Sequence, residues 1–374
     1  MPHPLPEGFT PASIELPAKF TGIVEAAPDG KPTITHNLVL PAPRPDEIVV
    51  KNLAVSINPY DWKMPRNYPS PGARIGCELY GEVLAIGPEA QTRRPDIQVG
   101  DRICGAIHGA NRIDHDSGSF CDYVSVPADM VIRLPPRYSP GAAASLGGTS
   151  LCTLALALWR SLKLEGTPTR PLNSNKSAPY VLVYGGSTAT GTMALQLLKL
   201  SGYRPITTCS PHNFKLVRQI GAEAAFDYRS PACTADIKAY TRGCLRYVLD
   251  IITDTTSQAI CHSVLGRAGG IYSSLESPSE ALNTRPRTVK VDFVVGPCAL
   301  GREVALSGDY YRPADPACRL LAGQLFDEVQ PLVEDGTITP HPHRVIGKGY
   351  QSVLKGIELL EKGVSGERLV VPIA

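Results

Sequence analysis

The sequence predicts an α/β protein with two domains, one a β-barrel and the other a doubly wound parallel sheet. The chain has 374 residues, and a single hydrophobic core rarely grows beyond about 250–300 residues. Residues 1–145 contain short runs of alternating apolar residues bounded by Pro and Gly, which is typical of strands. From residue 180 onward, apolar runs of strand length alternate with helical patterns, as in βαβ units.

The composition argues against several protein classes. Apolar residues make up 43% and charged residues 19%, which argues against a disordered chain. The 37 Lys and Arg nearly balance the 35 Asp and Glu, which argues against a nucleic-acid binder. The first fifteen residues lack the pattern of a signal peptide. No run approaches about 18 apolar residues, so we expect a cytoplasmic protein without a membrane span.

The cysteines show no metal or redox pattern. None of the ten forms a CxxC pair, so structural zinc and thioredoxin-type chemistry have no support. Most lie among apolar neighbours and are expected to be small buried hydrophobic residues. Reduced thiols suit the cytosol.

The first domain is expected over residues 1–175 and 312–374. Its predicted strands are EIVVKNLAVSI, GCELYGEVLAIG, VGDRICGAI and FCDYVSVPADMVIRLP, and an apolar helical stretch follows at 141–163. The tail returns to this domain with two helical segments, 316–336 and 349–363, and a final strand, ERLVVPI.

The second domain is expected over residues 176–311. It begins with the strand YVLVY (180–184), a glycine turn and a helix that Gly202 ends. Strand and helix patterns then alternate through PITTC, HNFKLVRQIG, AAFDY, CLRYVLDII, TTSQAICHSVLG and GGIYSSL. This order predicts a parallel sheet with helices on both faces.

The first turn of the second domain is a candidate phosphate site. It supplies Gly186 and Gly191 of a GxGxxG pattern, whereas Thr188 replaces the middle glycine. Its position between a strand and a helix is what dinucleotide binding requires. Backbone N–H groups at the helix N-terminus and the hydroxyls of Ser187, Thr188 and Thr190 could bind a pyrophosphate. The alternative is an ordinary capped helix.

The end of the next strand indicates which nicotinamide cofactor is bound. Sites for NAD usually carry Asp or Glu about 20 residues after the turn, where it binds the ribose 2′-OH. The corresponding segment, ITTCSPHNFK (206–215), has no carboxylate. It offers Ser210, His212, Asn213 and Lys215, donors that attract a 2′-phosphate. The sequence therefore predicts NADPH, with a solvated polar turn as the alternative.

Several motifs together resemble the medium-chain dehydrogenase/reductase family. They are NPYDWK (58–63), GCELYGEV (76–83) and the ending LLEKGVSGERLVV. The resemblance implies a GroES-like β-barrel catalytic domain and a Rossmann cofactor domain. Zinc-dependent members have a Cys and a GHE histidine where this chain has Asn58 and Cys77, and the four-cysteine cluster is missing too. We therefore expect no metal and a substrate that is already electrophilic.

Within that family, the chain most resembles the trans-acting enoyl reductases of fungal polyketide synthases. The shared pieces are NPYDWK, GGSTATG, CSPHN and FDYR. The resemblance implies a monomeric, NADPH-dependent oxidoreductase of secondary metabolism. Its partner would be the acyl-carrier domain of a polyketide synthase, or of a polyketide synthase–peptide synthetase hybrid, carrying the enoyl thioester. Two alternatives remain: a stand-alone quinone or enone reductase, and a non-catalytic NADPH-binding partner protein.

The resemblance also implies the site residues. The cofactor would contact Tyr60, Asp61, Trp62, Lys63, Ser187, Thr188, Ala189, Thr190, Ser210, Pro211, His212, Asn213, Lys215, Tyr228, Leu275, Glu276, Ser365 and Gly366. The substrate channel would pass Thr149, Ser150, Leu151, Cys152, Thr153, Gly296, Pro297, Cys298, Ala299 and Leu300.

Lys63 is the expected catalytic residue, because an ammonium group near the nicotinamide can supply a hydrogen bond or a proton. Its alternative is a phosphate or ribose contact without a catalytic role. Tyr60 could donate a proton or could only pack. Cys77 could be a reactive thiol, or a small buried residue.

Overall fold

The computed structural model describes residues 3–11, 13–14, 16–26, 29–173 and 178–373. The chain divides into two compact units, one of Met1–Cys152 with Leu300–Ala374 and one of Thr153–Ala299. Both divisions fall earlier in the chain than the predicted boundaries after residue 175 and before residue 312. The first difference arises because a π-helix, η2 (Ala155–Ser161), packs on strands of the second unit. The second arises because Arg302 pairs with Glu47 at 3.0 Å, which attaches that segment to the first unit.

The first unit is built around a seven-stranded sheet in the order β16-β17-β5-β6-β7-β9, with β8 also paired to β5. Its strands are β5 (Glu47–Ser56), β6 (Glu78–Ile86), β7 (Arg102–Ala106), β8 (Tyr123–Pro127), β9 (Val131–Arg133), β16 (His343–Val345) and β17 (Arg368–Pro372). Two small antiparallel pairs accompany the sheet, namely β1 (His3–Pro4) with β2 (Ser13–Ile14), and β3 (Phe20–Glu25) with β4 (Pro32–Leu38).

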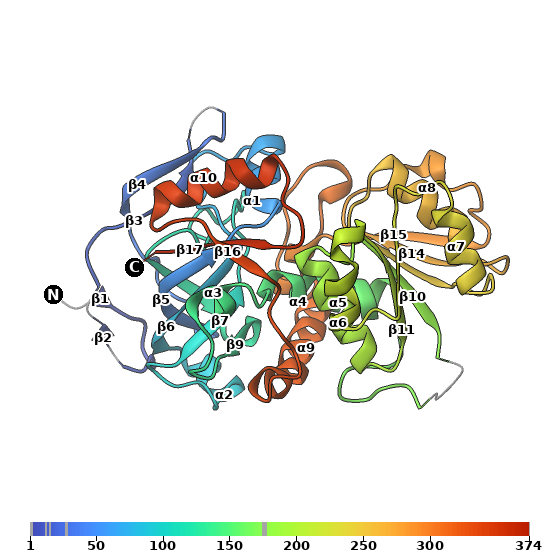
Figure 1. Cartoon of the computed structure of the whole chain (residues 1–374). Helices are drawn as coiled ribbons and strands as arrows, with labels where there is room; N and C mark the ends of the chain where they lie inside the picture. Colours follow the sequence, from blue (N-terminus) through green and yellow to red (C-terminus); the bar gives the residue numbers. More distant parts are fainter. Residues whose placement is uncertain (1–2, 12, 15, 27–28, 174–177, 374) are drawn as a thin grey trace. The chain divides into compact units, whose positions relative to one another are not determined.

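Helices cover this sheet and connect its strands. They are α1 (Tyr60–Asn67), α2 (Pro88–Arg93), α3 (Pro140–Ala144), α9 (Pro316–Glu334) and α10 (Tyr350–Glu361), with the short 3-10 helices η1 (Ala128–Met130) and η6 (Gly308–Tyr310). Helix α10 packs on β17 and β4, so the tail of the chain closes over its beginning (Figure 1).

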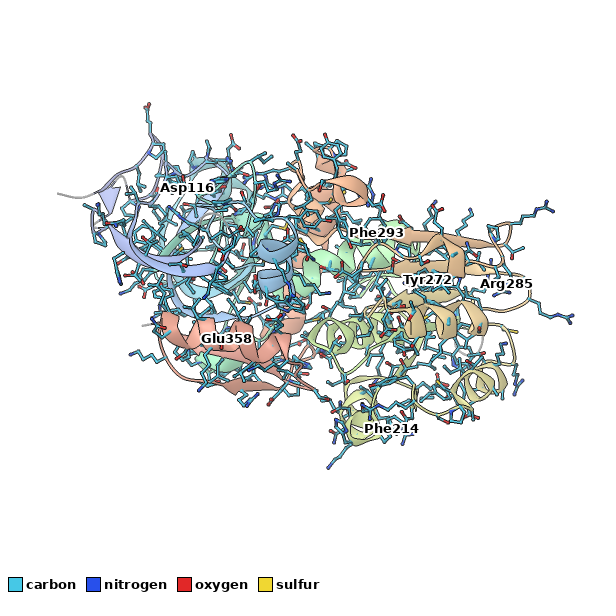
Figure 2. The ribbon with its side chains drawn as sticks, turned by 90° about the horizontal axis from the view of Figure 1, so that it is seen from above. Asp116, Phe214, Tyr272, Arg285, Phe293 and Glu358 are labelled. Atoms are coloured by element: carbon cyan, nitrogen blue, oxygen red, sulfur yellow. The ribbon has the colours of Figure 1, made fainter. Side chains whose placement is uncertain are left out.

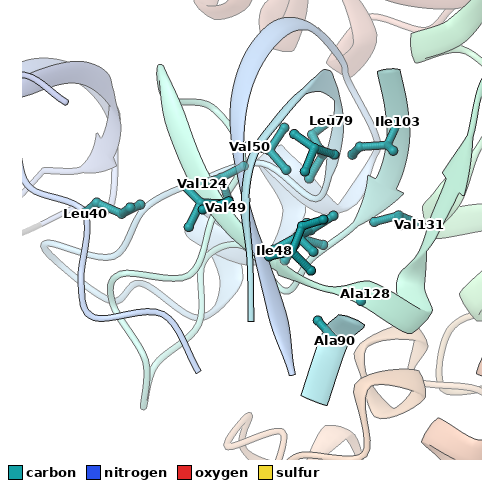
Figure 3. Packing of buried hydrophobic residues seen from close by; sticks show 14 of the residues in the cluster. Leu40, Ile48, Val49, Val50, Leu79, Ala90, Ile103, Val124, Ala128 and Val131 are labelled. Atoms are coloured by element: carbon teal, nitrogen blue, oxygen red, sulfur yellow. The ribbon is translucent and has the colours of Figure 1, made fainter. Parts of the chain in front are cut away.

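The core of the first unit lies between the sheet's curved strands. Ile48, Val49 and Val50 on β5 are fully buried, because this strand has neighbours on both sides and on both faces. They belong to one core cluster with Leu79 of β6 and Ile103 of β7 (Figure 3). Such burial on both faces is what closing an antiparallel sheet into a barrel produces.

The second unit is a six-stranded parallel sheet in the order β12-β11-β10-β13-β14-β15. This is the Rossmann order, in which the chain reverses direction across the sheet between its first and fourth strands. The strands are β10 (Tyr180–Tyr184), β11 (Arg204–Thr208), β12 (Ala224–Phe226), β13 (Tyr247–Asp250), β14 (Gly270–Ser274) and β15 (Val289–Phe293).

Helices connect these parallel strands and cover the sheet (Figure 1). They are α5 (Ala189–Leu200), α6 (Phe214–Ile220), α7 (Cys233–Tyr240) and α8 (Thr255–Val264), with the 3-10 helices η3 (Pro211–Asn213), η4 (Glu280–Leu282) and η5 (Gly296–Leu300). The predicted fold class, a β-barrel-like domain and a doubly wound parallel sheet, is thereby confirmed.

The apolar stretch predicted as one helix at 141–163 is segmented. Helix α3 is followed by α4 (Gly148–Leu154), and η2 then widens the helix by one residue per turn. Residues Pro140–Ser161 are long and apolar enough to cross a membrane, yet 83% of their most apolar window is buried inside the protein. Such burial is typical of a core helix of a folded domain.

Candidate active site

Glycines keep the turn between β10 and α5 free of side chains, so that its backbone is exposed to a ligand. Gly185 has a φ of +92°, a conformation that L side chains rarely adopt. A Cβ on Gly186 would overlap Thr207 Oγ1, and one on Gly191 would overlap the carbonyl oxygen of Gly185. Strand, turn and helix therefore approach one another without intervening side chains, which is the cradle that a pyrophosphate needs.

The Thr188 hydroxyl forms two hydrogen bonds within this turn. Its Oγ1 accepts from the N–H of Gly191 at 3.0 Å and donates to the carbonyl of Gly185 at 2.8 Å. The single hydroxyl proton is thus used inside the turn, where Thr188 is the N-cap of α5. The N–H groups of Gly191 and Thr192 both bond to Thr188, so the backbone N–H groups of Ala189 and Thr190, at the very start of the helix, are the ones that face its N-terminal end.

The end of β11 carries the side chains predicted to hold the 2′-phosphate. Ser210 and Asn213 are buried there, whereas Pro211, His212 and Lys215 are exposed. The N–H of Cys209 donates to the carbonyl of Phe226 at 3.1 Å, which brings the end of β12 alongside.

Tyr228, just beyond β12, extends this surface. Its ring lies 6.1 Å from the ring of Tyr184, and the Arg229 guanidinium lies 5.3 Å from the centre of the Tyr228 ring. The nearby carboxylate, Asp227, accepts a hydrogen bond from the backbone N–H of Arg229 at 3.0 Å. Tyr228 and Arg229 thus follow the end of β12 closely, whereas Lys215 lies in the first turn of α6, beyond the turn after β11.

The carboxyl ends of β13 and β14 adjoin the glycine turn. A Cβ on Gly185 would touch Ile252 at 3.0 Å, so the loop after β13 lies against the turn. The N–H of Leu275, directly after β14, donates to the carbonyl of Asp250 at 3.2 Å. The carbonyl of Glu276 accepts from Ser274 Oγ at 2.8 Å. The segments of the second unit predicted to touch cofactor therefore end at one edge of the sheet, beside its switch point.

Asp250 is a residue of this edge that sequence reasoning missed. Its buried carboxylate accepts from Ser257 Oγ at 2.7 Å, from Tyr272 OH at 2.9 Å and from the N–H groups of Ile252 and Thr253. Burial raises the pKa of Asp250, while these hydrogen bonds oppose the shift. Tyr272 lies inside the second unit (Figure 2). The signal in the sequence was an Asp ending the apolar run YVLD.

The two predicted substrate segments meet within the second unit. A Cβ on Gly296 would lie 2.9 Å from Thr153 Oγ1. Pro297, Cys298 and Ala299 follow Gly296 in η5, and Cys298 and Ala299 are buried. The small residue at 296 thus lets η5 approach the helix that carries Thr153.

A buried carboxylate organises the corresponding part of the first unit. Glu78 Oε2 accepts from Ser56 Oγ at 2.6 Å and from Asn58 Nδ2 at 3.0 Å, and it pairs with Arg368 at 2.9 Å. Glu78 Oε1 accepts from the N–H of Thr149 at 2.8 Å. The Glu78 side chain therefore connects two segments. One begins just after Asn58 and is predicted to contact the cofactor, and the other begins at Thr149 and is predicted to contact the substrate.

Arg368 completes this network from the last strand. Its Nη2 donates to Asn58 Oδ1 at 2.6 Å, and its side chain is only 3% exposed. The guanidinium supplies charge and donors close to Asn58, the position at which zinc-dependent relatives have a cysteine. The residues that the structure describes contain no group of three or more His, Cys, Asp or Glu that could hold a metal ion.

Cys77 and Asp61 lie together in a buried environment. Burial and the neighbouring Asp61 raise the pKa of the Cys77 thiol well above its usual value. The interpretation of Cys77 as a small buried residue is therefore favoured over that of a reactive thiol. Burial also raises the pKa of Asp61 to about 7, although its carboxylate accepts from the N–H of Asn58 at 2.7 Å.

Helix α1 carries the predicted catalytic residue. It begins at Tyr60, and Trp62 and Lys63 are half-buried in its first turn. The remaining predicted residues of the first unit lie elsewhere: Ser150, Leu151 and Cys152 are buried in α4, Leu300 is buried at the end of η5, and Ser365 and Gly366 lie between α10 and β17. The predicted cofactor and substrate residues are thus distributed over both units.

Comparison with known proteins identifies the family. Residues 44–136 match the family described as "Alcohol dehydrogenase GroES-like domain". The trans-enoyl reductase poxP of Penicillium oxalicum is 53% identical over 371 residues, covering 99% of this chain and 97% of that protein. The trans-enoyl reductase ccsC of Aspergillus clavatus is 48% identical over 364 residues, covering 97% and 99%. The chain belongs to the trans-enoyl reductases. It is therefore an oxidoreductase acting on C=C bonds, and the predicted resemblance is confirmed.

Solved structures agree on the fold of this trans-enoyl reductase. The CurK enoyl reductase aligns with a TM-score of 0.72 at 17% identity, covering 95% of this chain and 99% of its own. A putative zinc-dependent alcohol dehydrogenase from Rhizobium etli aligns with a TM-score of 0.74 at 22% identity, covering 95% and 98%. Both place the chain in the medium-chain dehydrogenase/reductase fold.

The second unit fits a nicotinamide cofactor, as this fold implies. The glycine cradle at Gly186 and Gly191 leaves room for a pyrophosphate at the N-terminus of α5. The strand order supplies the switch point at which dinucleotides bind. The polar side chains after β11 add hydrogen-bond donors. They lie about 20 residues after the glycine turn, which is where dinucleotide-binding domains hold the adenosine ribose.

Proposed function

We propose that this trans-enoyl reductase uses NADPH to reduce the α,β-double bond of an enoyl thioester carried by the acyl-carrier domain of a polyketide synthase. The observation that carries the proposal is the turn after β11. Residues 209–215 offer hydroxyl, amide, imidazole and ammonium groups where an NAD site usually has a carboxylate. A carboxylate there would repel a 2′-phosphate, whereas these groups can hydrogen-bond to it.

The proposed division of work leaves the chain mainly with binding and orientation. NADPH supplies the hydride when bound. Residues Ser187–Thr190 hold its pyrophosphate, the segment Ser210–Lys215 with Tyr228 holds the 2′-phosphate side, and Leu275 with Glu276 lies near the nicotinamide. Residues Tyr60–Lys63 and Ser365–Gly366 complete the cofactor contacts from the first unit. Excluding water around the reacting atoms strengthens every such interaction.

In this proposal, residues of the first unit stabilise charge on the substrate. Reduction at the β-carbon places negative charge on the thioester oxygen, and donors aimed at that oxygen lower the barrier. Lys63, in the first turn of α1, is the proposed charged donor. Glu78 and Arg368 neutralise each other, and Glu78 also bonds to Asn58 and Thr149. The pair therefore fixes the start of α1 relative to the substrate segment that begins at Thr149.

The proposed setting is a monomer that meets the synthase in the cytoplasm, where it serves secondary metabolism. All ten cysteines are free thiols, nine of them buried, which suits a reducing compartment. The partner surface would receive the carrier domain, or that of a polyketide synthase–peptide synthetase hybrid.

The experiment follows NADPH consumption with a crotonyl thioester on a pantetheine arm and, in parallel, a simple quinone. We expect turnover of the thioester with NADPH and much slower turnover with NADH. Turnover of the quinone alone would instead identify a stand-alone reductase. Tight NADPH binding without turnover of the thioester, even when it is presented on the carrier domain, would identify a non-catalytic partner protein.

A further inference from the structure

A tyrosine and a histidine from separate elements of the first unit form a close pair. The phenolic oxygen of Tyr60 lies 2.9 Å from Nε2 of His108, and the two rings meet edge to face with centroids 6.0 Å apart. Tyr60 is the first residue of α1 and is half-buried. His108 follows β7 and is only 5% exposed. A half-buried tyrosine therefore contacts a buried imidazole.

The backbone around His108 places this pair beside the Glu78 network. The N–H of Ile107 donates to the carbonyl of Cys77 at 3.0 Å, and Thr149 Oγ1 donates to the same carbonyl at 3.3 Å. A Cβ on Gly109 would overlap the backbone of Gly76, so the segment 107–109 is held tightly against the chain preceding β6. Thr149 is the first residue of the predicted substrate segment, and Ile107 is the neighbour of His108. Both therefore donate to the carbonyl of Cys77.

The burial of His108 determines its charge. Burial lowers the pKa of His108 to about 4, with Asp114 opposing and Arg302 assisting the shift. The imidazole is therefore neutral near pH 7, and one of its ring nitrogens carries a proton. When Nε2 carries it, the ring donates to the phenolic oxygen of Tyr60 and leaves the phenolic O–H directed elsewhere.

We propose that Tyr60 is the catalytic acid that protonates the α-carbon of the substrate, and that His108 is the residue that positions it. The inference rests on the proposed function and names the proton donor for that reaction. The donor must reach the substrate, which a half-buried phenol at the start of α1 can do and a buried imidazole cannot. In this assignment Lys63, one helical turn further on, stabilises the thioester oxygen.

The bonds and charges of this step balance. The hydride forms a C–H bond at the β-carbon, and the π-electron pair shifts toward the thioester carbonyl. The phenolic O–H bond of Tyr60 breaks as the α-carbon gains the proton and the carbonyl re-forms. The phenolate keeps the hydrogen bond from Nε2–H of His108 and regains its own proton from the solvent. The overall change is one enoyl thioester, one NADPH and one proton converted into one saturated thioester and NADP⁺.

The test compares Tyr60→Phe with a matched control, Tyr68→Phe. Tyr68 ends the same helix and packs against Tyr310 with ring centroids 5.9 Å apart. For Tyr60→Phe we expect kcat to fall by about 10²-fold, the loss typical of a missing general acid. The KM for the thioester and the far-UV circular dichroism should stay those of the wild type. Tyr68→Phe should retain the wild-type kcat.

A second readout follows the proton itself. In D₂O the wild type should place deuterium on one face of the α-carbon, because the donor is fixed. Tyr60→Phe should label both faces, because water then reaches the carbanion from either side. Wild-type kcat together with labelling on a single face in Tyr60→Phe would overturn the inference and leave the proposed function intact. A wild type that reduces no thioester would instead contradict the proposed function.

Two variants of His108 separate positioning from structural support. His108→Ala should lower kcat and mix the labelled faces, whereas His108→Gln retains an N–H donor and should recover most of both. If His108→Ala lowers only thermal stability and keeps single-face labelling, the positioning role is wrong. These variants also test the pair independently, should Tyr60→Phe fail to fold.

Discussion

Glu78 shows how one buried side chain sustains both halves of a candidate site. Its carboxylate and the Arg368 guanidinium are 2% and 3% exposed, and they lie 2.9 Å apart. Neither charge can be screened by water, so each depends on the other. Glu78→Gln keeps the shape but leaves the guanidinium without its counter-charge. We expect the free energy of unfolding to fall by about 3–5 kcal/mol, as measured by urea denaturation.

The matched control is a solvent-exposed pair in the same unit. Arg66 and Glu361 lie 2.5 Å apart, with side chains 64% and 45% exposed. Because water solvates both groups, Glu361→Gln should change stability by less than about 1 kcal/mol. Equal losses for the two variants would mean that burial of the Glu78 pair has no energetic consequence.

Lys215 provides a test of cofactor choice. It is exposed on α6, next to the polar turn after β11. Lys215→Glu places a carboxylate near the proposed 2′-phosphate, so the Kd for NADPH should rise by about tenfold or more, equivalent to about 1.4 kcal/mol. The Kd for NADH should change little. Fluorescence titration of both cofactors measures the two constants.

Lys238→Glu is the control for this charge reversal. Lys238 is an exposed lysine on α7 and lines a pocket of about 770 Å³ between α7, α8 and η4. Part of the pocket lining comes just before β14 in the chain, so the pocket lies at the amino ends of the strands. The glycine turn lies at the opposite, carboxyl ends. A similar loss of NADPH affinity in both variants would attribute the effect to net charge and would remove Lys215 from the site.

Individual residues also show where sequence reasoning succeeds. Gly186 and Gly191 were predicted because the strand–turn–helix spacing requires close approach, and both lack room for a Cβ. Asp250 and Arg368 were missed, because their partners come from distant parts of the chain. Asn58 and Arg368 are 310 residues apart in sequence and 2.6 Å apart in space.

Among the secondary-structure elements, α5 is the one on which cofactor binding depends most. Thr188 caps it by accepting from the N–H of Gly191. Thr188→Ala removes this cap and the bond to Gly185, so the free energy of unfolding should decrease by about 1 kcal/mol. Thermal and urea unfolding measure the change. Thr188→Ser keeps the hydroxyl and should retain most of the stability, whereas losses as large as those of Thr188→Ala would show that the methyl group matters instead.

The elements themselves were largely predictable, because period-two and helical apolar patterns are local. The strand predicted at 180–184 and the tail helices are present at β10, α9 and α10. The π-helix η2 was not predictable. Its residues form an ordinary apolar pattern, and the widened turn accompanies packing against β14 and β15, which only the folded chain supplies.

Over the whole molecule, stability toward acid reflects buried groups that act in opposite directions. Burial lowers the pKa of His341 to about 3, whereas it raises the pKa of Glu25 and of Asp61 to about 7. An unfolded histidine gains a proton below about pH 6.5 and the native one does not, so His341 reduces stability as the pH falls from 6.5. The two carboxyl groups add stability over the same range, because they are already protonated in the native state.

Replacing His341 should therefore expose its share of the acid response. In His341→Gln, the free energy of unfolding relative to wild type should rise as the pH falls from 6.5 toward 4, by up to about 1.4 kcal/mol per pH unit. Urea denaturation at several pH values measures this slope. His36→Gln alters an exposed histidine of β4 and should leave the profile parallel to wild type. A parallel profile for His341→Gln would contradict the argument.

The pairing of β17 with β5 determines the order in which a ribosome can complete the protein. Strand β5 spans Glu47–Ser56, but its neighbour β17 spans Arg368–Pro372. The residues of the second unit, 153–299, are all synthesised between these two strands. Strand β8, made early, already covers Glu47–Lys51 of β5, but Ala54–Ser56 must wait for β17 throughout that interval. Until then this short strand edge is exposed to pairing with other chains.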